Sequence, residues 1–236
     1  IHLSVQYLSC EHAGPEMSAT SPLYTSVAAD VCCYLSTRSQ LSIINRLDRE
    51  TSGLVLIAKN KTVARELGRL MERREVEKGY DAIVHGWPEW EEKVVDAPIL
   101  RRGEMEESKI YVMQMVHEAG KRCVTSLKVE RRFMVSGKKM SLLSVMPQTG
   151  RMHQIRVHLS YVDHPIVGDK IYGGNENLYL KFIENGVDEE MLNKLVLQRH
   201  ALHASRMSLI LQDRSYEWSS DIPDDMQRVL SRCEIV

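Results

Sequence analysis

Residues 148–159 of the chain read Gln-Thr-Gly-Arg-Met-His-Gln-Ile-Arg-Val-His-Leu. Pro147 and Gly150 break regular structure at the start of this stretch, and apolar residues then recur at helical spacing, so we predict a helix from near Thr149. Its apolar stripe consists of Met152, Ile155, Leu159 and Val162. Arg156 lies at the edge of the stripe, where a half-buried guanidinium needs a carboxylate or an equivalent partner.

The residues before this stretch predict β-structure. Residues 124–135 and 140–145 are β-like runs, and Ser136-Gly137 between them is typical of a hairpin connection. Further upstream, residues 54–58 predict a buried strand and residues 80–84 predict the next strand. Between these two strands, Thr62 resembles the N-cap of an amphipathic helix. The apolar stripe of that helix consists of Val63, Leu67, Leu70 and Met71.

The outer parts of the chain complete the expected element order. We predict a short helix at 23–35, helical segments near 176–199, a strand near 201–211 and a last helix from about Asp224. Because strands and helices do not alternate regularly, this order favours an α+β fold with a largely antiparallel sheet over a doubly wound fold. A linker would have to lie near 97–108, but no feature there requires two domains.

The composition is that of an ordinary globular protein. Of the 236 residues, 43% are hydrophobic and 27% are charged, which suffices for a core and argues against disordered and coiled-coil classes. No apolar run is long enough to cross a bilayer and no secretory leader is recognisable, so we expect a cytoplasmic chain. The five cysteines form no Cys-x-x-Cys pair, which favours reduced thiols in such a compartment.

The charge is unevenly distributed along the chain. The formal net charge of −1 by itself speaks against nucleic-acid binding. However, residues 38–80 carry 10 basic and 6 acidic side chains, and residues 120–170 carry 10 and 3. The neutral total is therefore an average over two basic segments and an acidic remainder, which an RNA-binding protein with one basic face could show.

A second polar stretch, residues 45–53, directly precedes the predicted strand at 54–58. Thr51 and Ser52 can tighten a turn there through hydroxyl–backbone hydrogen bonds. The charged residues fit a solvated loop with local ion pairs, which composition alone favours. They also fit a carboxylate, Asp48, held on a rigid loop at a sheet edge, where active sites often lie.

A third stretch, residues 78–86, places Tyr80 in a predicted strand, where packing alone explains a single tyrosine.

The two histidines of residues 148–159, His153 and His158, lack the spacing of the metalloprotease motif, so a zinc site is not indicated. Taken singly, none of the three stretches identifies a function.

Taken together, the three stretches resemble the RluA-type family of RNA pseudouridine synthases. The family motif His-Arg-Leu-Asp-x-x-Thr-Ser-Gly-Leu matches residues 45–54, with Asn45 in place of the usual histidine. Lys-x-Tyr-x-Ala-x-Val-x-Gly matches residues 78–86, and Thr-Gly-Arg-x-His-Gln-Ile-Arg-Val-His-Leu matches residues 149–159 without a break. The similarity continues in family style at 164–169, 172–173 and 201–204.

The resemblance implies a pseudouridine synthase fold over residues 41–236, with a central mixed, mostly antiparallel sheet flanked by helices and loops. Residues 1–40 depart from the family pattern because they lack its Lys-Pro-x-Gly turn. We therefore expect a divergent or truncated amino-terminal segment there.

The resemblance also implies isomerisation of specific uridines to pseudouridine in structured ribosomal or transfer RNA, with the target base flipped out. Asp48 matches the catalytic aspartate, and Arg156 matches the arginine that pairs with it. Tyr80 matches the tyrosine that stacks on the base, and Arg46 matches the arginine that enters the gap left by the flipped nucleotide. The expected pocket wall consists of Leu54 and Ile155.

Further residues are expected to bind RNA: Arg49, Arg151, His153 and Gln154 near the motifs, and Arg65, Arg69 and Arg73 on the helix at 62–76. The three arginines of the helix are spaced at i, i+4 and i+8, so they repel one another. Either a phosphate backbone relieves this repulsion, or Glu66 and Glu72 moderate a solvated face, and both interpretations remain open.

The implied reaction involves no redox change and no net group transfer, so we expect no cofactor and no metal. The carboxylate acts either as a nucleophile at C1′ or in removal of the 2′ proton, and both routes remain open. The expected partner is RNA, with no membrane, and the expected state is a monomer. The alternatives are a catalytically silent RNA-binding protein on the same fold and a metal-dependent hydrolase, which lacks ligand spacing here.

Overall fold

The computed structural model describes residues 3–8, 42–173, 179–180 and 196–233. The chain divides into two compact units: unit 1 comprises Ile1–Lys78 and Ala204–Asp221, and unit 2 comprises Gly79–His203 and Ile222–Val236. Two strands, β4 (Val76–His85) and β10 (Leu202–Leu211), each contain a boundary between the units. The helix expected at 23–35, and nearly all of the segments expected at 176–199, lie outside the described residues.

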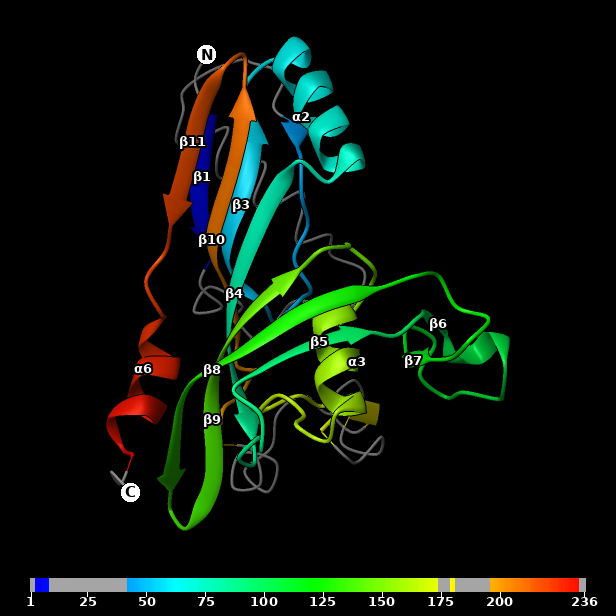
Figure 1. The fold of residues 1–236 in the computed structure, drawn as a ribbon, viewed down its shortest axis with the longest axis vertical. Helices are drawn as coiled ribbons and strands as arrows, with labels where there is room; N and C mark the ends of the chain where they lie inside the picture. The colour runs from blue at the N-terminus through cyan, green and yellow to red at the C-terminus, as the bar shows by residue number, and fades with distance from the viewer. Residues whose placement is uncertain (1–2, 9–41, 174–178, 181–195, 234–236) are drawn as a thin grey trace. The chain divides into compact units, whose positions relative to one another are not determined.

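In its described residues, unit 1 combines strands with a helix at residues 61–73 (Figure 1). Besides its parts of β4 and β10, its elements are β1 (Leu3–Leu8), β2 (Ser42–Ile43), β3 (Ser52–Ala58), α2 (Lys61–Arg73) and β11 (Arg214–Ser219). β3 pairs antiparallel with β1 and β2, and β10 pairs antiparallel with β11. Every residue of β3 is buried, which explains its unbroken apolar run. Leu56 of β3, Leu67 of α2 and Leu209 of β10 belong to one core cluster.

The N-cap of the helix α2 lies two residues earlier than the sequence predicts. Asn60, not Thr62, is the N-cap: its backbone is extended, and its side-chain oxygen accepts a hydrogen bond of 2.9 Å from the Val63 N–H. Asn and Thr are both favoured N-caps, so composition does not distinguish them. The helix ends at Arg73, and the C-cap residue Arg74 adopts the left-handed conformation.

Unit 2 contains a second set of antiparallel strands. Its elements, besides its parts of β4 and β10, are β5 (Glu92–Asp96), β6 (Ile99–Arg101), the 3-10 turn η2 (Arg102–Glu104), β7 (Gln114–Val116), β8 (Val124–Val135), β9 (Lys138–Pro147), α3 (Gln154–Tyr161) and α6 (Asp224–Ser231). The strands lie in the order β4-β9-β8-β5. Ser136 and Gly137 both have positive φ, which confirms the predicted hairpin between β8 and β9. β6 and β7 form a separate two-stranded sheet, and β6 with η2 occupies half of the segment considered as a linker.

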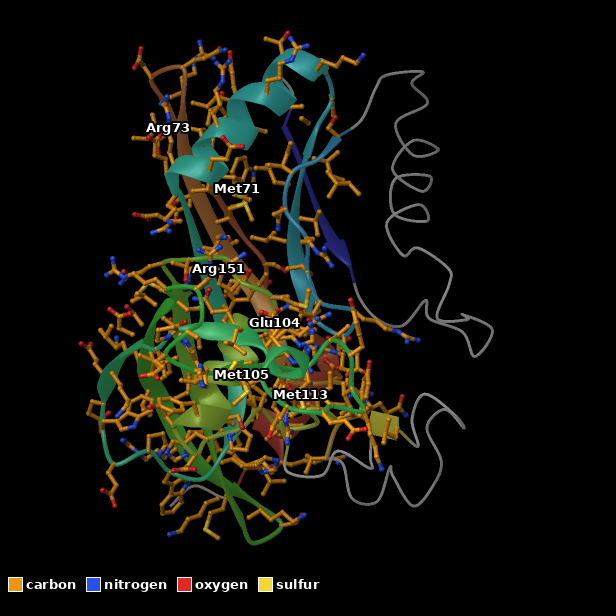
Figure 2. All side chains as sticks on the ribbon, turned by 90° about the vertical axis from the view of Figure 1, so that its right-hand side faces the viewer. Met71, Arg73, Glu104, Met105, Met113 and Arg151 are labelled. Carbon is orange, nitrogen blue, oxygen red and sulfur yellow. The ribbon has the colours of Figure 1, made fainter. Side chains whose placement is uncertain are left out.

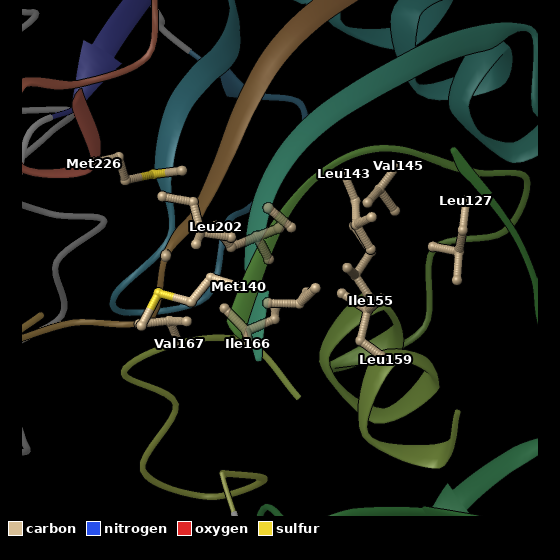
Figure 3. Packing of buried hydrophobic residues seen from close by; sticks show 14 of the residues in the cluster. Leu127, Met140, Leu143, Val145, Ile155, Leu159, Ile166, Val167, Leu202 and Met226 are labelled. Atoms are coloured by element: carbon tan, nitrogen blue, oxygen red, sulfur yellow. The ribbon is translucent and has the colours of Figure 1, made fainter. Parts of the chain in front are cut away.

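The core of unit 2 joins α3 and α6 to the strands. Ile155 and Leu159 of α3 point toward Leu143 and Val145 of β9, as Figure 3 shows, and all four belong to one cluster of buried residues. Met226 of α6 belongs to the same cluster. The carboxyl-terminal helix expected from about Asp224 is thereby confirmed.

The predicted α+β class is confirmed, because every strand pair whose register is described is antiparallel. Of the helices in the described ranges, none is both long enough and apolar enough to cross a membrane.

Candidate active site

The loop that carries Asp48 is tied to β3 within unit 1. The Asn45 side chain donates to the Leu54 carbonyl (3.3 Å) and accepts from the Leu56 N–H (2.7 Å). The Ile44 N–H also donates to the Leu56 carbonyl, and the Thr51 N–H donates to the Asp48 carbonyl (3.0 Å). An asparagine amide, which has both a donor and an acceptor, is suited to this double contact with a strand. Asp48 is half-buried on a loop whose backbone is fixed on both sides.

Gly53 allows this loop to enter β3 at close range to β10. Its φ is +116°, and a Cβ atom at this position would lie 2.2 Å from the carbonyl oxygen of Ala204. No other residue fits both the backbone angle and the space. The glycine that ends the motif at 45–53 therefore has a packing reason.

Tyr80 lies on β4 in unit 2, directly opposite Val145 of β9. It is half-buried and packs against the main core cluster of the unit. A strand in the middle of a sheet is a rigid support, so the position of this aromatic ring is well defined.

The loop at 149–153 is held by Gln154, and α3 begins only there. The Gln154 Oε1 accepts from the Thr149 hydroxyl (2.7 Å) and the Arg151 N–H (3.0 Å), while Nε2 donates to the Val124 carbonyl and the Thr125 hydroxyl (both 2.9 Å). These four hydrogen bonds attach the loop to β8. The amide is 4% exposed, so we interpret Gln154 as the residue that shapes this loop, and its expected contact with RNA stays a prediction.

The predicted start of this helix near Thr149 is wrong. α3 runs from Gln154 to Tyr161, and His153 before it has a φ of +55°. The Thr149 hydroxyl accepts from the Val124 N–H (3.1 Å), so the chain bonds to β8 where the periodicity predicted a helical turn. Met152 is consequently 50% exposed and does not extend the core stripe.

Arg156 forms a buried, two-pronged ion pair with Asp169 in unit 2. Its Nε lies 2.6 Å from Oδ2 and its Nη2 lies 2.8 Å from Oδ1 of the carboxylate. The two side chains are 6% and 0% exposed. The expectation that this guanidinium needs a carboxylate is confirmed, and Asp169 is a partner that the sequence did not indicate.

Further charged groups surround this pair. Lys170 Nζ donates to the Gln198 carbonyl (2.6 Å), and Arg199 pairs with Asp225 through Nε (2.7 Å) and Nη2 (2.9 Å). Burial, together with the charge of Arg156, holds the pKa of His200 well below its ordinary value, so this imidazole is neutral near pH 7. Burial alone would raise the pKa of Asp169, but the hydrogen bonds and charge of Arg156 outweigh it and hold that pKa well below its usual range.

The arginines expected to meet RNA are exposed. They are Arg46, Arg49, Arg65, Arg69 and Arg73 in unit 1 and Arg151 in unit 2. Arg73 lies at the carboxyl end of α2 (Figure 2). Glu66 of the same helix accepts a hydrogen bond from the Gln212 side chain (3.0 Å).

The expected pocket wall and the histidines have other contacts as well. Leu54 and Ile155 are 3% and 6% exposed and belong to the core clusters of unit 1 and unit 2 respectively. The Nδ1 atom of His158 lies 2.9 Å from the Thr125 hydroxyl oxygen, and its Nε2 atom lies 2.9 Å from the Ala97 carbonyl oxygen. Among the described side chains, no three His, Cys, Asp or Glu residues gather as potential metal ligands.

Comparison with known proteins gives consistent matches. The sequence profile described as RNA pseudouridylate synthase matches residues 29–161. Ribosomal large subunit pseudouridine synthase D of Blochmanniella floridana is 33% identical over 200 residues, covering 84% of this chain and 59% of that protein. The synthase D of Escherichia coli (strain K12) is 32% identical over 191 residues, covering 80% of this chain and 54% of that protein. The chain thus spans little more than half the length of these relatives.

Among solved structures, human RNA pseudouridylate synthase domain containing 4 superposes with a TM-score of 0.67 at 25% sequence identity. The match covers 90% of this chain and 84% of the human chain. Human RNA pseudouridylate synthase domain containing 1 gives a TM-score of 0.65 at 23% identity, which supports the fold.

Proposed function

Because the chain belongs to the RNA pseudouridylate synthase family, we propose that it isomerises specific uridines of RNA to pseudouridine. The observation that carries the proposal is the loop of Asp48, whose backbone is tied to β3 by Asn45 and Ile44. A carboxylate on an anchored loop, at the position of the family aspartate, is what the reaction requires.

The reaction breaks the N1–C1′ bond of uridine, turns the base, and joins C5 to C1′. The C5 proton leaves and N1 gains a proton, so the atoms balance without a cofactor. We propose that the Asp48 carboxylate either attacks C1′ or assists removal of the 2′ proton, and that Tyr80 stacks on the extruded base. Arg156 is proposed as the counterion of this carboxylate, since a nearby guanidinium favours the ionised form of a carboxyl group.

The proposed substrate is RNA of the large ribosomal subunit, since the matched relatives are named for it. Arg46, Arg49, Arg151 and His153 are proposed as RNA contacts near the reacting base. The chain is proposed to act as a monomer in the cytoplasm, where ribosomal RNA is modified.

Release of tritium tests this function directly. A large-subunit ribosomal RNA transcript made with [5-³H]uridine loses its label to water when C5 bonds to C1′. We expect the wild-type chain to release tritium and Asp48→Asn to release none, because an amide is neither the nucleophile nor the base that the reaction needs. Glu50→Gln removes a carboxylate from the same loop and is expected to keep the wild-type rate.

The outcome also separates the alternatives. The wild-type chain is tested on transcripts and on total cellular RNA. If it binds these RNAs but releases no tritium from them, the result supports a catalytically silent RNA-binding protein. Wild-type activity that survives in folded Asp48→Asn would show that another group carries the chemistry.

A further inference from the structure

The guanidinium of Arg156 is held along one edge by Asp169. Two parallel N–H···O contacts, from Nε and Nη2, fix the group in the plane of the carboxylate. Nη1 takes no part in this pair, so the pair engages two of the five N–H donors of the side chain. The two side chains come from different segments, α3 and the turn that follows Gly168.

Main-chain groups hold the Asp169 carboxylate in turn. Its Oδ1 accepts from the N–H groups of Ile171 (2.9 Å) and Tyr172 (3.0 Å). The Gly173 N–H closes the turn on the Asp169 carbonyl (3.0 Å), and a Cβ on Gly173 would lie 2.2 Å from that oxygen. Backbone N–H groups therefore fix the orientation of the carboxylate, and the carboxylate in turn orients the Arg156 guanidinium.

The same guanidinium lies over the ring of Tyr172. The ring centroid lies 5.1 Å from the Arg156 Cζ atom, within the range of a cation–π contact. The Tyr172 hydroxyl accepts from the Gln114 N–H (3.0 Å) and shares a hydrogen bond with His153 Nδ1 (2.8 Å). Arg156 is thus held by a carboxylate through two hydrogen bonds and also contacts a ring that is itself anchored.

We propose that Asp169 is a positioning residue of the isomerisation, which holds the Arg156 guanidinium in one orientation for the reacting carboxylate. The inference rests on the proposed function and adds to it a residue outside the three motifs that led to it. Donors that are fixed before the reaction need no reorganisation during it, and a small misplacement of such a group lowers the rate markedly.

Unit 2 contains an internal control for this proposal. Arg199 and Asp225 form a second two-pronged pair with nearly the same distances, and Arg199 is 6% exposed. Asp169→Asn and Asp225→Asn each remove one carboxylate charge from a buried arginine. Asp225 is 29% exposed and Asp169 is 0% exposed, so their effects on stability can differ. A purely structural role predicts that neither substitution changes kcat of the folded protein.

The test measures kcat and KM for tritium release, on protein shown to be folded by circular dichroism. We expect Asp169→Asn to lower kcat by about 10- to 100-fold with KM within about twofold of wild type. Asp225→Asn is expected to leave kcat within about twofold, whatever it does to thermal stability. Equal effects of the two variants on kcat would overturn the proposal.

A double-mutant cycle with Arg156→Met adds a readout that instability does not move. If Asp169 acts through Arg156, then adding Asp169→Asn to Arg156→Met changes the single-turnover rate by less than about threefold. Additive losses would show that Asp169 acts independently and would overturn the proposal. Asp225→Asn in the same background provides the matched comparison.

Two further outcomes are distinguishable. Should Asp169→Asn not fold, Asp169→Glu keeps the charge but moves the carboxylate by about 1.5 Å, one carbon–carbon bond; folded Asp169→Glu with a wild-type kcat refutes the proposal. A folded wild-type chain that releases no tritium refutes the proposed function, whereas an active wild-type chain with unaffected Asp169 variants refutes the positioning role alone.

Discussion

At the scale of single residues, the anchored loop depends on Gly53, a position where a side chain has no room. Gly53 combines a φ of +116° with a backbone neighbour, Ala204, that a Cβ atom would approach to 2.2 Å. The atoms of Ala204 that the Cβ would approach, its carbonyl oxygen and its nitrogen, belong to the main chain and cannot rotate away. By contrast, Gly68 in α2 has no atom within 4 Å of the position that its Cβ would take.

Gly53 and Gly68 together provide a stability prediction, in which Gly68→Ala is the control for Gly53→Ala. Gly53→Ala should lower the free energy of unfolding by about 2–4 kcal/mol, because strain and overlap both act at this position. Gly68→Ala should raise it by about 0.5–1 kcal/mol, because alanine favours an open helical position. Urea denaturation measures both, and a loss of stability in Gly68→Ala comparable to that in Gly53→Ala would contradict the structural argument.

Sequence reasoning identified residues whose chemistry is local and failed where a partner is distant. The position of Asp48 on a constrained turn and the need of Arg156 for a carboxylate followed from the residues near each. Asp169 is 13 positions from Arg156 in an irregular segment, and no periodicity indicates such a contact. The one available signal was the similarity at 164–169, which continues the family pattern without a role attached.

At the scale of elements, types were predictable and boundaries were not. β3, α2, β4, the β8–β9 hairpin, β10 and α6 all lie where hydrophobic patterns indicated them. The starts of α2 and α3 were misplaced for the same reason. Asn60 and Gln154 bond backbone groups through their amides, and these bonds depend on geometry that a sequence pattern does not show.

The outer face of α2 yields a prediction about RNA binding. Arg65→Gln with Arg69→Gln should weaken binding of the ribosomal RNA transcript and lower the slope of log K against log salt by up to about 2, if each arginine meets a phosphate. Arg228→Gln with Arg232→Gln removes the same charge at exposed positions of α6 and just beyond its end, and should leave the slope unchanged. Equal losses in both pairs would indicate a general charge effect and favour a solvated α2 face.

At the scale of the whole molecule, the largest core clusters of the two units together account for most of the buried apolar side chains in the described residues. The two basic segments, 38–80 and 120–170, fall essentially one in each unit. Unit 2 also buries ionisable groups, among them Arg156, Asp169, His158 and His200. Such groups make the stability of the chain depend on pH in a direction that their environment determines.

The histidines of this set predict a loss of stability in mild acid. Burial lowers the pKa of His158 and of His200, although the Ala97 carbonyl and the Asp169 carboxylate partly oppose this. Between the folded pKa and the unfolded value of about 6.5, the unfolded chain binds protons that the folded chain does not. Stability is therefore full above about pH 6.5 and falls as the pH decreases, by up to about 1.4 kcal/mol per pH unit for each histidine. Asp169, whose folded pKa is lowered, keeps its contribution to stability until the pH falls below about 4.

Urea denaturation at pH 7.5, 6.0 and 5.0 should show the loss of stability that the histidines cause. His158→Gln should make the free energy of unfolding depend less steeply on pH over this range. The same slope in wild type and folded His158→Gln would contradict a role for the buried imidazole, whereas a decline that begins only below about pH 4 would assign acid sensitivity to the carboxylates instead.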